Sequence, residues 1–524
     1  MQLRMRIAAG VLLLFAPAGV WAAKKPAEPK PEPPDMTIRF DIDQPTYHDR
    51  SKSKSFPDLG YAGCIADEGP VYCDEFFVKH PDETWETFKK AGAYVVKLWG
   101  ADGQWARDRE RAKITYDWRK KHNVKTLLCL EAYDRTVDSA RTRILEFVQW
   151  IVDNGYTNTV AGFELGNEPY WGSQPEQYAD RWAAIVPDMK RIWPEAQIGF
   201  ILAELESGDP DLQVVRRRFT NVEAILGQDS GLGLDKINNW SGRFVMQFKD
   251  TIKYCSHVVY HFYGGFGPYG CTFNGIRKIR HFAEIFPEVA GKKVWITEWR
   301  FTSDMDLRSQ QTFQIAQFDA LYMLMIVCQK EVEGISAHQC GQLAGGFYYT
   351  DGKGRWTQRA HGLGSDMYSD PDWTGHPKLE VGPVGPTFQL FNEALMGHPH
   401  VITHGCRYNG SITSGFYQIG NIWGGGEHIV DWVLLTNPGR TSAALMVCNC
   451  GSRPFKPPLE TKGCTFGRPH YRVYRCKHEQ VNWHQWPGEP RIAWMEEYDG
   501  EEGKIFIPEE SVCTITFPIT KEAK

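Results

Sequence analysis

The sequence predicts an α/β protein that consists of a (β/α)8, or TIM, barrel followed by an accessory C-terminal β-sandwich. From about residue 58 to residue 397, short apolar runs alternate with longer amphipathic segments, which is typical of repeated β–α units around a parallel sheet. From residue 398 to residue 524 the pattern changes to short alternating strands separated by turn signals. A chain of 524 residues is long enough for a large barrel with one accessory domain.

The N-terminus has the pattern of a secretory signal peptide, which we expect to span residues 1–22. Arg4 and Arg6 precede an apolar run that starts at Ile7 and is too short to cross a membrane comfortably. Residues 23–35 follow as a Pro-rich linker. We therefore expect a secreted or periplasmic protein without a membrane span after cleavage, and an uncleaved N-terminal anchor is the less favoured alternative.

The barrel region contains eight candidate strands, with helical patterns between most of them. No G-x-G-x-x-G motif follows the first of them, so an open doubly wound sheet is less favoured. The predicted strands are Leu59–Ile65, Ala93–Trp99, Val124–Leu130, Thr159–Leu165, Gln197–Ala203, His257–Phe262, Lys293–Thr297 and Gly334–Gln339.

The sandwich is predicted from short strands with turn signals such as Asn437-Pro438-Gly439 between them. An N-terminal segment, residues 36–57, precedes the barrel, and the alternating stretch Met36–Ile42 within it could add one strand to the sandwich. The predicted C-terminal strands include Ile429–Leu435, Ser442–Cys448, Tyr471–Tyr474 and Val512–Phe517.

Composition excludes several classes of protein. The net charge is −5 and no long run of one sign occurs, so we expect no nucleic-acid partner. Hydrophobic residues make up 42% and charged residues 23%, which excludes a disordered, collagenous or polytopic membrane protein. The 13 cysteines fit an oxidising compartment, but their odd number leaves at least one thiol unpaired or joined to another molecule. No cysteine or histidine pair has a second pair at zinc-finger spacing, so no structural metal is predicted.

Two apolar strands end in a glutamate. Glu168 follows Asn167 and precedes Pro169, and because proline stops the strand, this carboxylate is placed at the C-terminal rim, where barrel active sites are built. Glu298 follows Thr297 at the end of the seventh predicted strand. The fourth and seventh strands of a closed barrel can direct both side chains into one cavity. Two carboxylates across a cavity are the minimum requirement for cleaving a glycosidic bond.

These motifs resemble those of the clan-A glycoside hydrolases, which are retaining enzymes on a (β/α)8 barrel. The Asn167-Glu168 pair is similar to the clan's strand-four motif, which implies that Glu168 is the acid/base and that Asn167 binds the sugar 2-hydroxyl. Glu298 is similar to the strand-seven nucleophile, and His261 and Tyr263 lie where clan members place a residue near that nucleophile. The resemblance covers the architecture from Asp58 onward, but only about thirty residues in recognisable motif.

Further residues near the predicted strand ends are candidates for substrate binding. Tryptophans there offer flat rings on which sugars stack. The predicted eighth strand has no tryptophan at the position that many clan members use, so His338 is expected to line the pocket instead. Glu164 lies four residues before Glu168, and we interpret it as a structural ion-pair partner of Lys97. The full set of predicted substrate-binding residues is Asn167, His261, Tyr263, Trp99, Trp171, Trp299 and His338.

The sequence thus predicts a secreted retaining glycoside hydrolase that acts on a polysaccharide or oligosaccharide and uses no cofactor or metal. Three alternatives stay open: a transglycosylase on the same site, a non-catalytic carbohydrate-binding cell-surface protein, and an inverting hydrolase. The sugar, its linkage, endo or exo action and the oligomeric state stay open as well.

Overall fold

The computed structural model describes residues 37–522 except residues 63–72, 133–135, 204–232, 264–278, 281, 284–285, 301–311, 334–346, 351–377, 408–429, 482 and 484–490. The predicted signal peptide and Pro-rich linker lie outside these residues, so both stay predictions. In the described part of the chain, no helix combines the length and the apolar composition that crossing a lipid bilayer requires.

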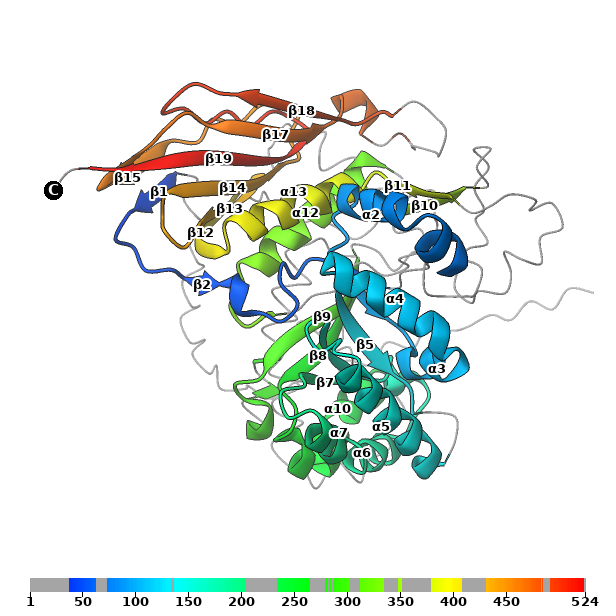
Figure 1. Cartoon of the computed structure of the whole chain (residues 1–524). Helices are drawn as coiled ribbons and strands as arrows, with labels where there is room; N and C mark the ends of the chain where they lie inside the picture. The colour runs from blue at the N-terminus through cyan, green and yellow to red at the C-terminus, as the bar shows by residue number, and fades with distance from the viewer. Residues whose placement is uncertain are drawn as a thin grey trace, which may run out of the picture.

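Seven parallel strands form the wall of a barrel, and each pairs with the strand that follows it in the sequence (Figure 1). They confirm seven of the predicted barrel strands. The predicted eighth, residues 334–339, lies outside the described residues, but Val332 just before it makes a parallel bridge to Val294 of the seventh strand. The strands are β3 (Tyr61–Ala62), β4 (Val95–Leu98), β5 (Lys125–Leu130), β6 (Val160–Leu165), β7 (Ile198–Ile201), β8 (His257–Tyr263) and β9 (Lys293–Arg300).

Helices cover the outside of the barrel (Figure 1), and local sequence signals set their ends. The Asp108 side chain accepts a hydrogen bond from the backbone N–H of Arg111, which caps the start of α4, and Asn123 ends α4 at a φ of 54°. The Thr136 side chain caps the start of α5 in the same way. The helices are α2 (Pro81–Lys90), α3 (Ala101–Arg107), α4 (Arg109–His122), α5 (Val137–Asp153), α6 (Pro175–Ala183), α7 (Val186–Ile192) and α10 (Gly233–Ile252).

The amino-terminal end of the barrel interior is filled by the ring of Trp295 on β9. Gly162 on β6 and Gly199 on β7 make room for it, because a Cβ atom at these positions would lie 2.2 and 2.7 Å from the indole. His257 stacks on the same ring at a centroid distance of 4.0 Å. This packing fills the amino-terminal end of the barrel interior.

The C-terminal part forms an antiparallel sheet in the order β18-β17-β19-β14-β13-β12-β2, with β16 added beside β19. The predicted strand within residues 36–42 is confirmed as β1, which pairs in parallel with β15 and packs into the same core. The strands are β1 (Ile38–Asp41), β2 (His48–Asp49), β12 (His400–Arg407), β13 (Val430–Thr436), β14 (Ser442–Asn449), β15 (Leu459–Lys462), β16 (Cys464–Phe466), β17 (His470–Arg475), β18 (Trp494–Asp499) and β19 (Ser511–Lys521). A separate hairpin joins β10 (Phe347–Thr350) to β11 (Lys378–Val381).

Two helices, α12 (Phe313–Val327) and α13 (Gly385–Gly397), lie between the barrel and the C-terminal sheet (Figure 1). Every residue of α12 is buried, as expected for a helix that is apolar on all sides. Gln317 of α12 donates a hydrogen bond of 2.9 Å to the Glu510 carboxylate of the β domain. The barrel and part of the sheet therefore share one hydrophobic core.

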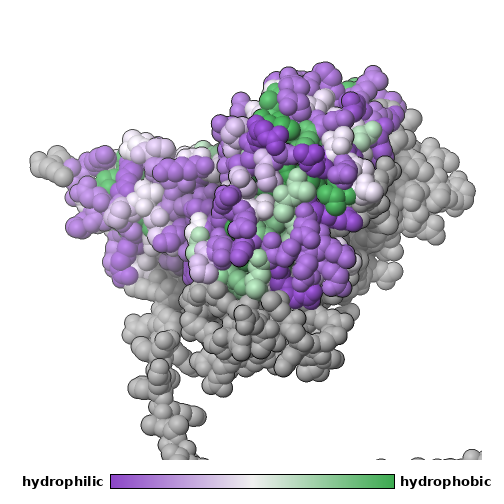
Figure 2. Space-filling model, turned by 90° about the horizontal axis from the view of Figure 1, so that it is seen from below, coloured by the Kyte–Doolittle hydropathy of each residue, from purple (hydrophilic) through white to green (hydrophobic). Residues whose placement is uncertain are grey.

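The eight cysteines whose side chains the structure describes are buried free thiols. Five of them lie in the C-terminal part, namely Cys448, Cys450, Cys464, Cys476 and Cys513. The sulfur atoms of Cys448 and Cys450 are 3.4 Å apart. Because the described cysteines form no disulfide, the prediction of export depends on the N-terminal pattern. The face of the molecule seen from below is mostly hydrophilic, with separate groups of apolar residues (Figure 2).

Candidate active site

Glu168 stands just beyond the carboxyl end of β6. The strand stops at Leu165, Gly166 turns the chain at a φ of 77°, and Glu168 itself has a φ of 42°. Pro169 then opens the short helix η4 (Pro169–Trp171). A positive φ on a residue other than glycine costs free energy and is concentrated at functional sites. The backbone thus turns at Glu168, and its side chain stays 25% exposed.

Glu298 lies on β9 at an irregularity in the strand pairing. Tyr260 pairs with Ile296 and the next residue of β8, His261, pairs with Glu298, so Thr297 is an extra residue on β9. Neighbouring residues of a regular strand face opposite sides, and a bulge changes that alternation. As a result, Thr297 and Glu298 both reach Lys97, with Oγ1 and Oε1 at 3.5 and 3.0 Å from its Nζ atom.

Lys97 on β4 connects the two glutamate motifs. Its buried ammonium donates to Glu164 Oε1 at 2.9 Å, to Glu298 Oε1 at 3.0 Å and to Asn167 Oδ1 at 3.2 Å. The predicted ion pair between Lys97 and Glu164 is therefore confirmed. Burial alone opposes the ammonium charge, but the carboxylates of Glu164 and Glu298 outweigh it and raise the pKa of Lys97.

The contact between Lys97 and Glu298 was not predicted. A lysine in the middle of the apolar strand Val95–Leu98 is the signal that could have indicated it, because a fully buried lysine needs an anionic partner. The structure shows two such partners, and one of them is the predicted nucleophile.

The indole of Trp99 also contacts the predicted nucleophile. Its Nε1 donates a hydrogen bond of 3.0 Å to Glu298 Oε1, the same oxygen that Lys97 contacts. The sequence interpretation treated Trp99 only as a stacking surface, whereas the structure shows that it is a polar donor. Two donors hold Oε1, and the other oxygen, Oε2, faces His261 at 3.6 Å.

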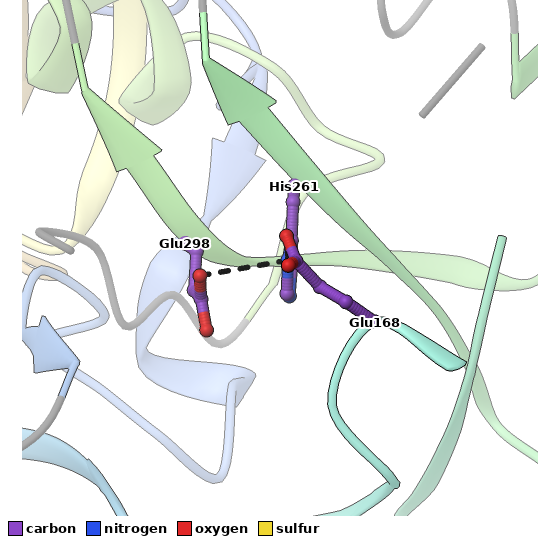
Figure 3. Close-up of side chains that lie close together, drawn as sticks. All are labelled: Glu168, His261 and Glu298. Carbon is purple, nitrogen blue, oxygen red and sulfur yellow. Dashed lines mark hydrogen bonds and ion pairs between the residues drawn. The ribbon is translucent and has the colours of Figure 1, made fainter. Parts of the chain in front are cut away.

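His261 lies between the two catalytic candidates (Figure 3). Its Nδ1 is 2.9 Å from Glu168 Oε1, and its Nε2 is 3.0 Å from Thr297 Oγ1. Burial alone would favour the neutral ring, but Glu298 and the contacts with Glu164 and Glu168 outweigh it and raise the pKa of His261 to about 9.

Tyr170 is a site residue that the sequence analysis missed. Its hydroxyl donates a hydrogen bond of 3.1 Å to Glu168 Oε1, the oxygen that His261 also contacts. It follows Glu168 by two residues in an aromatic Tyr-Trp pair, and this pair was the available signal.

Of the other predicted substrate-binding residues, the structure describes the side chain of Trp299. Trp299 does not offer a stacking surface, so that prediction is wrong: the ring is 0% exposed and stacks on Tyr322 of α12 at 5.2 Å. Since Glu298 faces the site, its neighbour on the strand faces the helices outside the barrel. The side chains of Trp171 and Tyr263 and the whole of His338 lie outside the described residues.

Glu168, His261 and Glu298 each place a nitrogen or oxygen atom within 4.8 Å of the others (Figure 3). Atoms of this kind and spacing could also hold a divalent cation. The Lys97 ammonium already supplies positive charge beside Glu298, and the raised pKa of His261 opposes the binding of a metal to its ring. The arrangement suits a reaction in which one carboxyl group, in its protonated form, donates a proton and the other, as a carboxylate, attacks.

No protein-family model matches the sequence, and no curated protein matches it. Solved structures do match. A crystal structure of an arabinofuranosidase aligns with a TM-score of 0.60 at 11% identity, covering 92% of this chain and 99% of that one. The GH51 α-L-arabinofuranosidase of Thermotoga petrophila RKU-1 aligns with a TM-score of 0.59 at 12% identity, covering 92% and 99%. The fold is that of the clan-A glycoside hydrolases.

A third structure, BuGH86 in complex with neoagarooctaose, aligns with a TM-score of 0.53 at 12% identity and covers 93% of this chain and 78% of that one. These similarities confirm the predicted fold class, a TIM barrel with a C-terminal β domain. At such low identity they establish the clan-A fold alone. The roles of individual residues rest on the geometry of this site.

Proposed function

We propose that this protein is a secreted retaining glycoside hydrolase with Glu168 as acid/base and Glu298 as nucleophile. The observation that carries the proposal is the approach of the two carboxylates to within 4.8 Å at the carboxyl ends of β6 and β9. Retaining glycosidases place their carboxyl groups about 5–5.5 Å apart, whereas inverting enzymes need roughly 6.5–9.5 Å to admit a water molecule. The spacing supports retention.

The geometry gives each residue a role. Glu168, in its protonated form, donates a proton to the leaving oxygen while Oε2 of Glu298 attacks the anomeric carbon, because Lys97 and Trp99 hold Oε1. Water then attacks the glycosyl–enzyme and gives a proton to Glu168, which releases Glu298. Asn167 is held by Lys97 through Oδ1 and is proposed to bind the 2-hydroxyl.

For the substrate we propose an oligosaccharide or polysaccharide. Similar structures are described as arabinofuranosidases and as a complex with neoagarooctaose. Arabinose-containing plant glycans and agar-type galactans are therefore the first members of the test panel.

The deciding experiment measures release of reducing sugar from plant, algal and bacterial glycans by the wild type, Glu168→Ala and Glu298→Ala. On a glycan that is cut, we expect activity to fall by roughly 10²–10⁴-fold without the acid/base and by more without the nucleophile. NMR of the first product should show a retained anomeric configuration.

The matched control is Glu176→Ala, which removes a glutamate from a half-exposed ion pair with Arg243 away from the barrel interior. It should keep wild-type activity. Cleavage that survives both site substitutions would refute the assignment. Transfer products without hydrolysis would identify a transglycosylase, and sugar binding without turnover would identify a binding protein.

Secretion is part of the proposal and rests on the N-terminal pattern of residues 1–22. Expression with and without this segment, followed by N-terminal sequencing of the exported protein, tests it. We expect export to require the segment and the mature chain to start near Ala23.

A further inference from the structure

One ring nitrogen of His261 faces both proposed catalytic carboxylates. Nδ1 lies 2.9 Å from Oε1 of Glu168, just beyond β6, and 3.6 Å from Oε2 of Glu298 on β9. The ring is 1% exposed, so water does not screen it from either carboxylate. Figure 3 shows the two glutamates converging on this ring.

The surroundings of the second ring nitrogen also suit a protonated ring. Nε2 lies 3.0 Å from Thr297 Oγ1 and 3.5 Å from Glu164 Oε1, so groups that can accept a hydrogen bond face both nitrogens. An imidazolium donates from both nitrogens, whereas a neutral ring donates from one only. The remaining nearby charge is Lys97, which contacts Glu164 and Glu298.

A count of the charges in this cluster indicates the role of a protonated His261 ring. When Glu168 is protonated and Glu298 ionised, the cations Lys97 and His261 balance the anions Glu164 and Glu298. When Glu298 has become a glycosyl ester and Glu168 is ionised, the same two cations balance Glu164 and Glu168. A neutral His261 would leave one uncompensated negative charge in a buried site at both stages.

We propose that His261 stays protonated throughout the reaction and serves as the counter-ion of whichever catalytic carboxylate is ionised. This inference rests on the proposed function. The ring proton is not transferred: the proton that reaches the leaving oxygen comes from Glu168, and the one that returns to Glu168 comes from water. The hydrogen bond of Nδ1 instead shifts between Glu168 and Glu298 as the negative charge moves. His261 is thus a positioning residue that acts through the two carboxylates.

The test compares the pH dependence of kcat/KM in the wild type and in His261→Gln. Loss of the cation removes positive charge beside both carboxylates and so disfavours their ionised forms. Both limbs of the bell-shaped profile should therefore move to higher pH by about one unit, with a fall in rate of at least tenfold. A lower rate with unmoved limbs would mean a merely structural role and would overturn the proposal. A basic limb that moves to lower pH would overturn it too, because His261 would then be the source of the transferred proton.

The control is His257→Gln on the same strand. This buried histidine lies 3.8 Å from a carboxylate of its own, Glu333, but packs on Trp295 at the amino-terminal end of the barrel. Both limbs should stay in place in this variant.

A second measurement does not depend on turnover. In NMR spectra of wild-type protein labelled in its histidine rings, the His261 signals should be those of an imidazolium at pH 7. His261→Gln assigns the signal, and Glu168→Gln assigns it through its neighbour if the first variant does not fold. A neutral ring at pH 7 would overturn this inference, whereas a wild type inactive on every glycan would overturn the proposed function.

Discussion

Among the described residues of the barrel region, two clusters of buried charges differ in how they are built. At the carboxyl ends of the strands, the carboxylates of Glu164, Glu168 and Glu298 share the cations Lys97 and His261. Near the amino-terminal end, Arg50 and Asp58 form a pair of one cation and one anion at 2.6 Å, with both side chains 0% exposed.

The Arg50–Asp58 pair is also closed by further hydrogen bonds. Arg50 donates to the Val332 carbonyl at 2.9 Å, and Asp58 accepts from Ser53 and Ser55 at 2.6 and 2.8 Å. This pair contains one cation for one carboxylate. The cluster at the other end has an excess of carboxylates, and Glu168 keeps an exposed edge. The difference teaches that charge balance marks a structural ion pair, whereas imbalance with access to solvent marks groups that change ionisation during chemistry.

Removing a cation from the cluster of Glu164, Glu168, Glu298, Lys97 and His261 should have the largest effect. Lys97→Met removes the cation that contacts Glu164 and Glu298, and leaves these buried carboxylates short of positive charge. We expect a loss of about 3–5 kcal/mol in the free energy of unfolding and a fall in kcat/KM of roughly 10³-fold or more. Chemical denaturation and steady-state kinetics measure the two quantities. Lys97→Arg keeps the charge and should recover part of both; near-wild-type kinetics in Lys97→Met would contradict the prediction.

Breaking the Arg50–Asp58 ion pair should affect stability alone. Arg50→Met leaves Asp58 buried without its cation, so the free energy of unfolding should fall by about 3–5 kcal/mol. Because the pair lies away from the catalytic candidates, kcat/KM per folded molecule should stay within about twofold of wild type. Urea unfolding and kinetics at a temperature where the variant is folded decide this. A large drop in kcat/KM with unchanged stability would show that the two groups are coupled.

A more conservative substitution tests the hydrogen-bond donors that contact the predicted nucleophile, Glu298. Trp99→Phe removes the indole N–H that contacts Glu298 Oε1 and leaves Lys97 in place. A hydrogen bond to a charged group contributes about 1.5–3 kcal/mol, so kcat/KM should fall by roughly 10–100-fold. If Trp99 acted only as a stacking ring, phenylalanine would keep most of its function and the loss would be confined to KM.

The two ends of the barrel should also respond oppositely to pH. Burial, together with the nearby Arg50, lowers the pKa of His48 to about 4. As pH falls from about 6.5 toward 4, His48 is therefore protonated in the unfolded chain before it is protonated in the folded protein, and stability is lost over this range. His261, with a pKa raised to about 9, contributes stability below about pH 6.5 that is lost as pH rises through 9.

Unfolding by urea across this pH range measures both contributions. His48→Gln should flatten the acidic side of the stability profile, and His261→Gln should flatten the alkaline side. These are the smallest effects expected here. An acidic side that is unchanged in His48→Gln would show that other groups control it.

Much of the barrel was predictable from sequence because its signals are local. The runs Val160–Leu165 and Lys293–Thr297 each reach the length of a buried strand. The first forms β6, and the second forms the main part of β9. Pro169 indicated that Glu168 lies past the end of its strand, and this position was predicted correctly, although β6 already stops at Leu165. The Lys97–Glu164 pair was predictable because a charge on a buried strand needs a partner.

Only the tertiary structure decided how these residues meet. The irregular pairing at Thr297 turns two adjacent side chains toward Lys97, and it arises from the register between β8 and β9, which no single strand encodes. The same alternation turns Trp299 into the core shared with α12. The bridge that His261 makes between Glu168 and Glu298 joins residues of β8, of β9 and of the turn after β6, 37 to 130 positions apart in sequence. Hydrophobic periodicity and turn residues are signals that extend over a few positions of the sequence. The contacts of Lys97, His261 and Trp299 instead depend on closure of the barrel, so they can be seen only in the folded chain.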